Sequence, residues 1–129
     1  LSQPAKIYIM LGSNGIAWMS IDSMISKYST FFTAVHTAAP KAKIYIEAIL
    51  PVTAAKETSD ERYSNSKIND YNAKLSEFAK SQGVTFLDTH SALVTSDGTL
   101  NTQYAEADGM HLKKAGYEAL LEYFKSHTN

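Results

Sequence analysis

The sequence contains no cysteine, which excludes disulfide bonds, thiolate zinc sites and cysteine nucleophiles together. It has no run of like charge, and 12 basic against 13 acidic residues give a net charge of −1, so a nucleic-acid partner is not expected. No apolar run approaches the ~20 residues of a membrane-spanning helix. Leu1 to Pro4 show no signal-peptide character, and the compartment stays open. The 129 residues are enough for one domain, residues 1–129.

Three short apolar runs are present instead, at residues 6–11, 43–50 and 84–88. Their length and β-branched content are typical of strands buried on both faces, as in a parallel sheet. Residues 52–66 are polar, and we expect a solvated loop there. Residues 113–127 have the spacing of a last helix whose buried side chains are Ala115, Leu120, Leu121 and Phe124.

Two amphipathic helices are expected between the strands. The first begins at a cap, Ser20 or Asp22, and ends before Pro40. The second ends at Gly83. The apolar face of the first consists of Met24, Tyr28, Phe31, Phe32 and Val35. The corresponding face of the second consists of Ile68, Tyr71, Asn72, Leu75, Phe78 and Ala79.

The alternation of strands and helices predicts an α/β fold of three layers, α/β/α, with a parallel sheet. Ligands bind such sheets beyond the carboxyl ends of the strands. Polar groups follow all three strands at that edge. They are Gly12–Gly15, Pro51–Thr53, Asp88 with His90, and Asp108 with His111 on the loop after the third strand. We therefore expect these groups to converge on one site.

Asp108 and His111 have the spacing of a carboxylate that orients a histidine base. The alternative is that Asp108 caps the last helix and His111 is a surface residue. Asn14, just past a buried strand, is a candidate donor to an oxyanion, an interaction that contributes ~3 kcal/mol to lowering a barrier. The same residue is also typical of a turn that tolerates left-handed backbone. Residue types alone leave both pairs of interpretations open.

Other kinds of site find less support. The "GSNG" segment lacks the glycine spacing of a dinucleotide site and the G-K-[ST] of a phosphate loop. Ser13 does not occupy the serine position of a G-x-S-x-G nucleophile elbow. The four histidines lack metal-ligand spacing, so we expect no metal and no cofactor. His36 and His127 are interpreted as surface residues, and His90 as a loop histidine with a structural hydrogen bond.

With these residues in view, the chain resembles the SGNH (GDSL-type) esterase/lipase family. "IMLGSNG" matches the family's strand followed by G-x-N-D, and "DGMHLKKAGY" matches its D-x-x-H-L and following helix. The intervening "IYIEAILPV" and "INDYNAKLSEFAKSQGVTFLD" extend the similarity over nearly the whole chain. The resemblance implies a flavodoxin-like SGNH hydrolase fold and hydrolysis of an O-acyl ester of a small molecule, such as an acetylated carbohydrate or a lipid.

The resemblance also assigns roles to residues. It implies that His111 is the general base, Asp108 orients it, and Asn14 donates to the oxyanion hole. Gly12 permits the turn that aims Asn14. Trp18 either rims the acyl or alcohol pocket or packs against the first helix. The family's Asp after the Asn, which supports the turn, is Gly15 in this sequence.

The family's G-D-S block, with its nucleophilic serine, does not occur in residues 1–129. The resemblance therefore implies a partial domain that starts at the family's third strand and is inactive alone. We expect the free edge of the strand at residues 6–11 to pair with a missing N-terminal segment or to self-associate. The alternative is a degenerate SGNH-like binding or scaffold domain. A flavodoxin-like nucleotide or response-regulator domain ranks last, because no phosphate loop or acidic cluster supports it.

Overall fold

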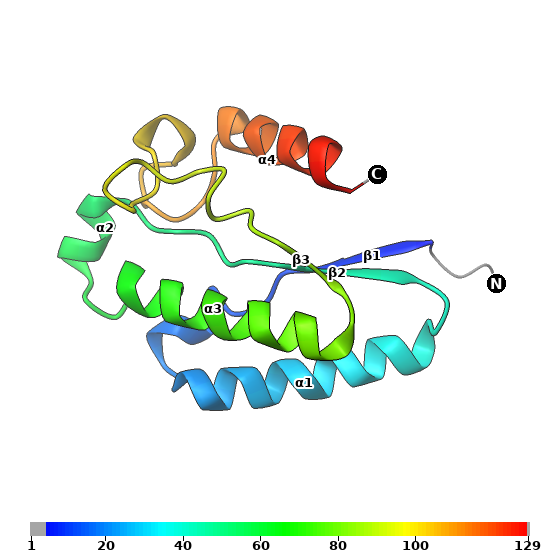
Figure 1. Ribbon diagram of the computed structural model, residues 1–129. Helices are drawn as coiled ribbons and strands as arrows, with labels where there is room; N and C mark the ends of the chain where they lie inside the picture. Colours follow the sequence, from blue (N-terminus) through cyan, green and yellow to red (C-terminus); the bar gives the residue numbers. More distant parts are fainter. Residues whose placement is uncertain (1–4, 129) are drawn as a thin grey trace.

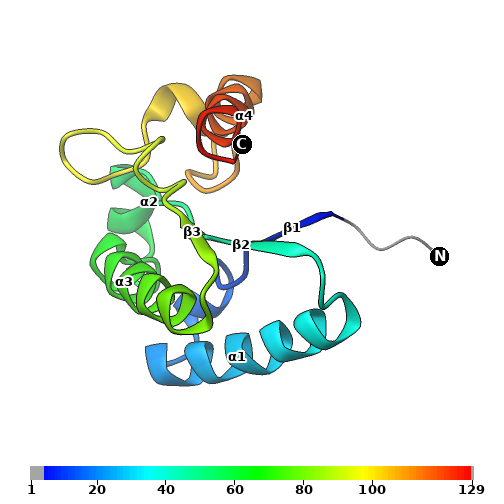
Figure 2. The ribbon, with the colours of Figure 1, turned by 45° about the vertical axis from the view of Figure 1, so that its right-hand side comes forward.

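The computed structural model describes residues 5–128, and its centre is a parallel sheet of three strands. β1 (Lys6–Ile9), β2 (Lys43–Glu47) and β3 (Thr85–Leu87) pair in the order β1-β2-β3, with Ile7 opposite Ile44. α1 (Ile21–Ala38) and α3 (Asn65–Gln82) cover one face, and α4 (Lys114–His127) covers the other (Figures 1 and 2). The predicted α/β/α layering is therefore confirmed.

Each strand is shorter than its apolar run, and β2 shows why. Beyond Glu47 the chain stays buried but leaves the sheet. The backbone of Ile49 is satisfied by a side chain instead, because the Asn72 amide accepts from its N–H at 2.8 Å and donates to its carbonyl at 3.0 Å. The residues that follow β2 are thus fixed as a loop at the carboxyl edge of the sheet.

The helix signals place α1 and α3 correctly. Ser20 caps α1 by accepting from the Ser23 N–H, and α3 ends at Gly83 in the left-handed conformation, with φ 70°. Tyr28 and Phe32 are buried as expected, but Phe31 is 44% exposed. Phe31 lies on the flank of α1, because the buried positions of this helix recur every four residues.

The prediction for the last helix is wrong at two positions, since Ala115 and Leu121 are exposed. α4 packs through Gly116 and Leu120 against the irregular chain before it, including η2 (Thr102–Tyr104). A Cβ at residue 116 would lie 2.8 Å from the Tyr104 carbonyl oxygen. This close approach, which only glycine permits, rotates the buried face of α4 away from the expected one.

The prediction that residues 52–66 form an irregular loop is also wrong. This segment contains α2 (Ala54–Ser59), capped by Thr53, whose hydroxyl accepts from the Lys56 N–H at 3.2 Å. Val52, Thr53 and Asn65 are buried. The Asn65 amide holds Val52 through two hydrogen bonds of 3.0 Å, so the ends of this segment are fixed, while residues 54–64 are half-buried or exposed as expected.

Candidate active site

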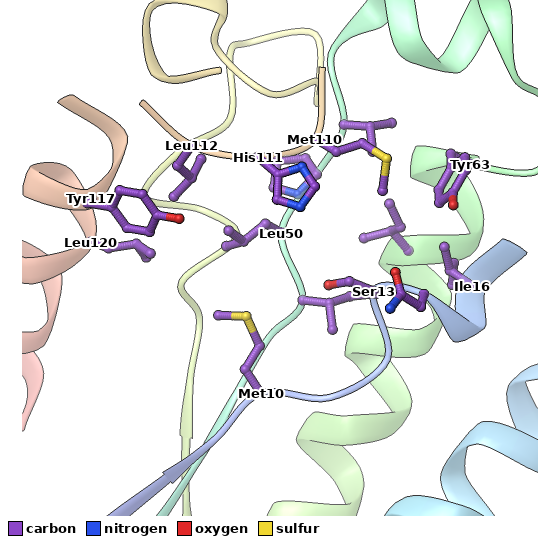
Figure 3. A pocket seen from close by; sticks show the side chains of 15 residues that line it. Met10, Ser13, Ile16, Leu50, Tyr63, Met110, His111, Leu112, Tyr117 and Leu120 are labelled. Atoms are coloured by element: carbon purple, nitrogen blue, oxygen red, sulfur yellow. The ribbon is translucent and has the colours of Figure 1, made fainter. Parts of the chain in front are cut away.

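A cavity of about 350 Å³ lies at the carboxyl edge of the sheet (Figure 3). Three loops contribute to it: Ser13 and Asn14 after β1, residues 49–52 after β2, and residues 110–112 before α4. Most of the remaining lining is apolar, including Ile68 of α3 and Leu120 of α4. The fold thus brings Asn14 and His111 to one cavity, although almost a hundred residues separate them.

Asp108 and His111 form a hydrogen-bonded pair at the rim of this cavity. The His111 Nδ1 contacts Asp108 Oδ2, while Asp108 Oδ1 accepts the backbone N–H groups of Met110 and His111, each at 2.9 Å. These bonds, led by the one from the His111 ring, lower the pKa of Asp108 to about 2. An ionised Asp108 fixes the His111 tautomer with its proton on Nδ1, so Nε2 is available to accept a proton.

The loop that carries this pair is held against the start of α2. The Thr53 N–H donates to the Gly109 carbonyl at 3.0 Å. Gly109 has φ +73°, and a Cβ there would lie 2.5 Å from Thr53 Oγ1 and 2.7 Å from Lys56 Cβ. Both residues of the "DG" in the motif therefore have a structural reason. Asp108 is needed as the hydrogen-bond acceptor, and Gly109 is needed because only glycine permits this close approach.

Asn14 belongs to residues 12–19, which contain η1 (Gly15–Ala17) and which we call the oxyanion loop after the role predicted for Asn14. The Asn14 backbone is helical (φ −78°, ψ −37°), and its side chain makes no capping hydrogen bond. Asn14 lines the cavity, and its carboxamide has no hydrogen-bond partner among residues 5–128. Gly12, at φ +127°, starts the loop in a conformation that L side chains rarely adopt, so the expected need for glycine at the turn has a geometric basis.

Two side chains of α3 hold the oxyanion loop, and the sequence reasoning missed both roles. The Tyr71 hydroxyl donates to the Leu11 carbonyl at 2.9 Å, and the Tyr71 ring lies under Gly12. The Lys67 ammonium donates to the carbonyls of Ile16 at 2.8 Å and Met19 at 2.6 Å. The available signal was their spacing, since a lysine one turn before a buried tyrosine faces the same side of the helix.

Trp18 does not line the cavity. Its side chain is 72% exposed, and the Arg62 guanidinium lies over its ring, 4.4 Å from the centroid. Asp60 holds that guanidinium with hydrogen bonds of 2.8 and 2.7 Å. Tyr63, the neighbour of Arg62, does line the cavity. Trp18 is therefore an exposed residue in contact with Arg62, and it neither lines the cavity nor belongs to the core.

Asp88 and His90 do not join the site, contrary to the expected convergence. They line a separate polar hollow with Asn72 and other residues of α3. The Asp88 carboxylate accepts from the Ser91 hydroxyl at 2.6 Å, which turns the chain back after β3. Burial lowers the pKa of His90, and its Nε2 is buried with no hydrogen-bond partner in residues 5–128. The structural hydrogen bond expected for His90 is therefore not formed by that atom.

The described part of the chain also lacks a metal-binding cluster and a membrane-spanning helix. Within residues 5–128, no three His, Asp or Glu side chains are grouped so that they could hold a metal ion. No helix among these residues is long and apolar enough to cross a membrane.

Comparison with solved structures shows close similarity of fold. A Streptococcus pneumoniae protein provisionally described as a platelet activating factor superposes with a TM-score of 0.85 and 29% identity, over 95% of this chain and 58% of that protein. A GDSL-like lipase from Bacteroides thetaiotaomicron superposes with a TM-score of 0.75 and 23% identity, over 95% of this chain and 61% of that protein. An acetylxylan esterase from Geobacillus stearothermophilus superposes with a TM-score of 0.72 and 18% identity, over 95% of this chain and 58% of that protein. The chain thus spans about three fifths of the length of these relatives.

No curated protein matches the sequence. The family model of the GDSL-like lipases and acylhydrolases, a family of ester hydrolases, matches residues 2–119, which is most of the chain. On that match, this chain belongs to the GDSL-like lipase/acylhydrolase family.

Proposed function

We propose that residues 1–129 supply the general base, its orienting carboxylate and one oxyanion donor of a serine esterase. The observation that carries the proposal is the Asp108–His111 pair at the rim of the cavity that Asn14 also lines. Family membership gives the reaction class, ester hydrolysis. The mostly apolar lining suits the acyl group of the ester, and the alcohol is a carbohydrate or a lipid.

The proposed reaction has two steps. A serine hydroxyl attacks the ester carbonyl, His111 Nε2 takes the hydroxyl proton, and the carbonyl oxygen becomes an oxyanion that accepts a hydrogen bond from the Asn14 amide. When the intermediate collapses, the alcohol leaves with the proton from His111, and an acyl-serine remains. Water then attacks the acyl-serine while His111 takes a proton from it; the second intermediate collapses, the serine oxygen leaves with the proton from His111, and the carboxylic acid is released.

The serine of this reaction is proposed to come from outside residues 1–129. Ser13 lines the cavity, but no hydrogen bond joins it to His111 within the described chain, and it does not stand at the serine of an elbow motif. The His111 and Asp108 side chains are 76% and 45% exposed. Covering them would remove water from the site and strengthen the charge interactions that the reaction uses.

The proposed place for the serine-bearing segment is the free edge of β1. Within residues 5–128, β1 pairs only with β2. Tyr8 of β1 is 41% exposed, and its ring lies 5.5 Å from that of Phe124 in α4, a helix that also exposes Tyr117 and Leu121 by 59 and 53%. An unpaired apolar edge is a template for another strand. Without the serine-bearing segment, a second copy of the chain is expected to occupy it.

Hydrolysis of p-nitrophenyl acetate tests the proposal. The protein encoded by the full reading frame that contains residues 1–129 should hydrolyse this ester with an initial burst of p-nitrophenol, whereas residues 1–129 alone should not. His111→Ala should lower kcat by about 10³-fold or more, and His36→Ala, an exposed histidine of α1, should not change it. A reading frame with no burst and no loss on His111→Ala would favour the binding or scaffold domain instead.

The association at β1 has its own measurement. Light scattering of residues 1–129 after gel filtration should show a dimer or larger species, and Tyr8→Lys should shift it toward monomer. A monomer at all concentrations for the unsubstituted chain would contradict the proposed exposed edge.

A further inference from the structure

We infer that Lys67 of α3 is the positioning residue of the oxyanion loop, and that it sets where the Asn14 amide points. The inference rests on the proposed role of Asn14 as oxyanion donor. Lys67 does not line the cavity, so it acts through the loop rather than on the substrate.

The contacts of Lys67 are directed at the end of the loop. Its ammonium donates to the carbonyls of Ile16 at 2.8 Å and Met19 at 2.6 Å. The Ile16 carbonyl lies in η1 and the Met19 carbonyl two residues beyond it, and neither accepts a backbone N–H within residues 5–128. Hydrogen bonds from an ionised donor are about twice as strong as neutral ones. No carboxylate forms an ion pair with Lys67 among residues 5–128, so its charge is committed to the loop.

Ile16 is the one fully buried side chain of the loop, 1% exposed within the main hydrophobic cluster, and the residues before it contribute no polar side-chain support. Gly15 has no side chain, and Asn14 makes no capping bond. Backbone bonds from Ile16 to Gly12 at 3.0 Å and from Met19 to Gly15 at 2.8 Å give the turn its shape, but they do not attach it to the rest of the protein. Apart from the buried Ile16 side chain, the hydrogen bonds that attach the loop come from α3, at one end through Tyr71 and at the other through Lys67. Asn14 lies between these two anchors.

Loss of the Lys67 anchor should therefore move the Asn14 amide without unfolding the domain. An oxyanion donor has to lie about 2.7–3.1 Å from the oxygen it stabilises. A displacement of about 1 Å costs on the order of 10²-fold in rate. Since the amide stabilises the transition state and not the bound ester, the loss should fall on kcat rather than on KM.

The first experiment measures the loop directly in residues 1–129, whether or not they are active. Trp18 is the single tryptophan and lies in the oxyanion loop, so its fluorescence reports on this segment. In Lys67→Met, we expect the backbone amides of residues 12–19 to exchange hydrogen about tenfold faster and acrylamide quenching of Trp18 to change. Lys74→Met, an exposed lysine of the same helix, is the matched control and should leave both unchanged.

Lys67→Arg should restore slow exchange, because a guanidinium has enough donors to reach both carbonyls. If Lys67→Met does not fold, Lys67→Gln, which keeps a donor without the charge, takes its place in the comparison. Exchange of residues 12–19 in the folded variant that matches the unsubstituted chain would overturn the inference.

The second experiment measures catalysis in the translated reading frame. Per active site counted by the burst, Lys67→Met should lower kcat about 10- to 100-fold with KM changed less than about threefold, and Lys67→Arg should recover most of the loss. A role in stability alone would lower the number of active sites but not kcat per site. An active enzyme whose Lys67→Met variant keeps full kcat overturns the inference and leaves the esterase proposal intact. An inactive reading frame defeats the esterase proposal, and hydrogen exchange still decides whether Lys67 anchors the loop.

Discussion

Replacement of Gly12 by alanine should be among the most destabilising single methyl additions in this protein. Alanine at φ +127° carries about 1–3 kcal/mol of backbone strain. Its Cβ would lie 2.6 Å from Tyr71 Cε2 and 2.9 Å from both Cζ and the hydroxyl oxygen. Tyr71 is 1% exposed and has little room to move, so overpacking adds about 1–3 kcal/mol. Displacing its hydroxyl from the Leu11 carbonyl costs about 1 kcal/mol more.

These contributions predict a loss of about 3–7 kcal/mol in the free energy of unfolding. Gly98→Ala is the matched control. Gly98 also has a positive φ, +81°, but a Cβ there would have no atom within 4 Å, so strain alone should cost about 1–2 kcal/mol. Urea unfolding followed by far-ultraviolet circular dichroism measures both variants. If Gly12→Ala costs no more than Gly98→Ala, the close contact with Tyr71 is not what requires glycine at residue 12.

Three further predictions follow from buried or paired polar groups. Burial raises the pKa of Glu47 above its ordinary value of 4.5, so the contribution of this residue to stability is greatest below pH 4.5 and is lost as the pH rises through the folded-state pKa. Glu47→Gln should therefore raise the free energy of unfolding at pH 7 but not at pH 4, as measured by urea unfolding at both pH values. Asn72→Ala leaves the buried N–H and carbonyl of Ile49 unpaired and should cost about 2–5 kcal/mol in the same assay, against less than about 0.5 for the exposed Asn69→Ala. Asp108→Asn should lower kcat of the active reading frame by about 10³- to 10⁴-fold with little change in stability, and a fall below tenfold would contradict its role in fixing the His111 tautomer.

The elements whose signals are local were predictable from the sequence. α1 and α3 follow from apolar positions three and four apart, and their ends follow from Ser20 and Gly83, because caps act within one turn. The order of elements then sets the parallel sheet and its carboxyl edge. Asn14 and His111 meet at one cavity for that reason, since each follows its strand at the same edge.

The elements that depend on tertiary contacts were not predictable in this way. The burial of α4 depends on the approach of Gly116 to the Tyr104 carbonyl, which no helical period reports. The order at residues 52–66 comes from Asn65, whose partners lie 13 residues earlier in the chain. Lys67 illustrates the limit best. A lysine on an amphipathic helix is typical of a solvated surface. Only the fold shows that the Lys67 ammonium donates hydrogen bonds to two carbonyls of a loop distant in sequence.

The position of α3 explains how this site is held together. Four of its side chains bond backbone atoms of the loops that follow β1 and β2: Asn65 to Val52, Lys67 to Ile16 and Met19, Tyr71 to Leu11, and Asn72 to Ile49.

The loop after β2 in turn holds the third loop, through the bond from the Thr53 N–H to the Gly109 carbonyl. The oxyanion loop is therefore attached to α3 directly, and the Asp108–His111 loop is attached to the same helix through the loop after β2. A small shift of α3 would carry Asn14 and His111 in the same direction and preserve their separation, whereas loss of a single anchor would change it. For this reason the Lys67 and Asn72 substitutions should differ in kind. Lys67→Met should alter the placement of one donor, while Asn72→Ala should loosen the segment that supports the base.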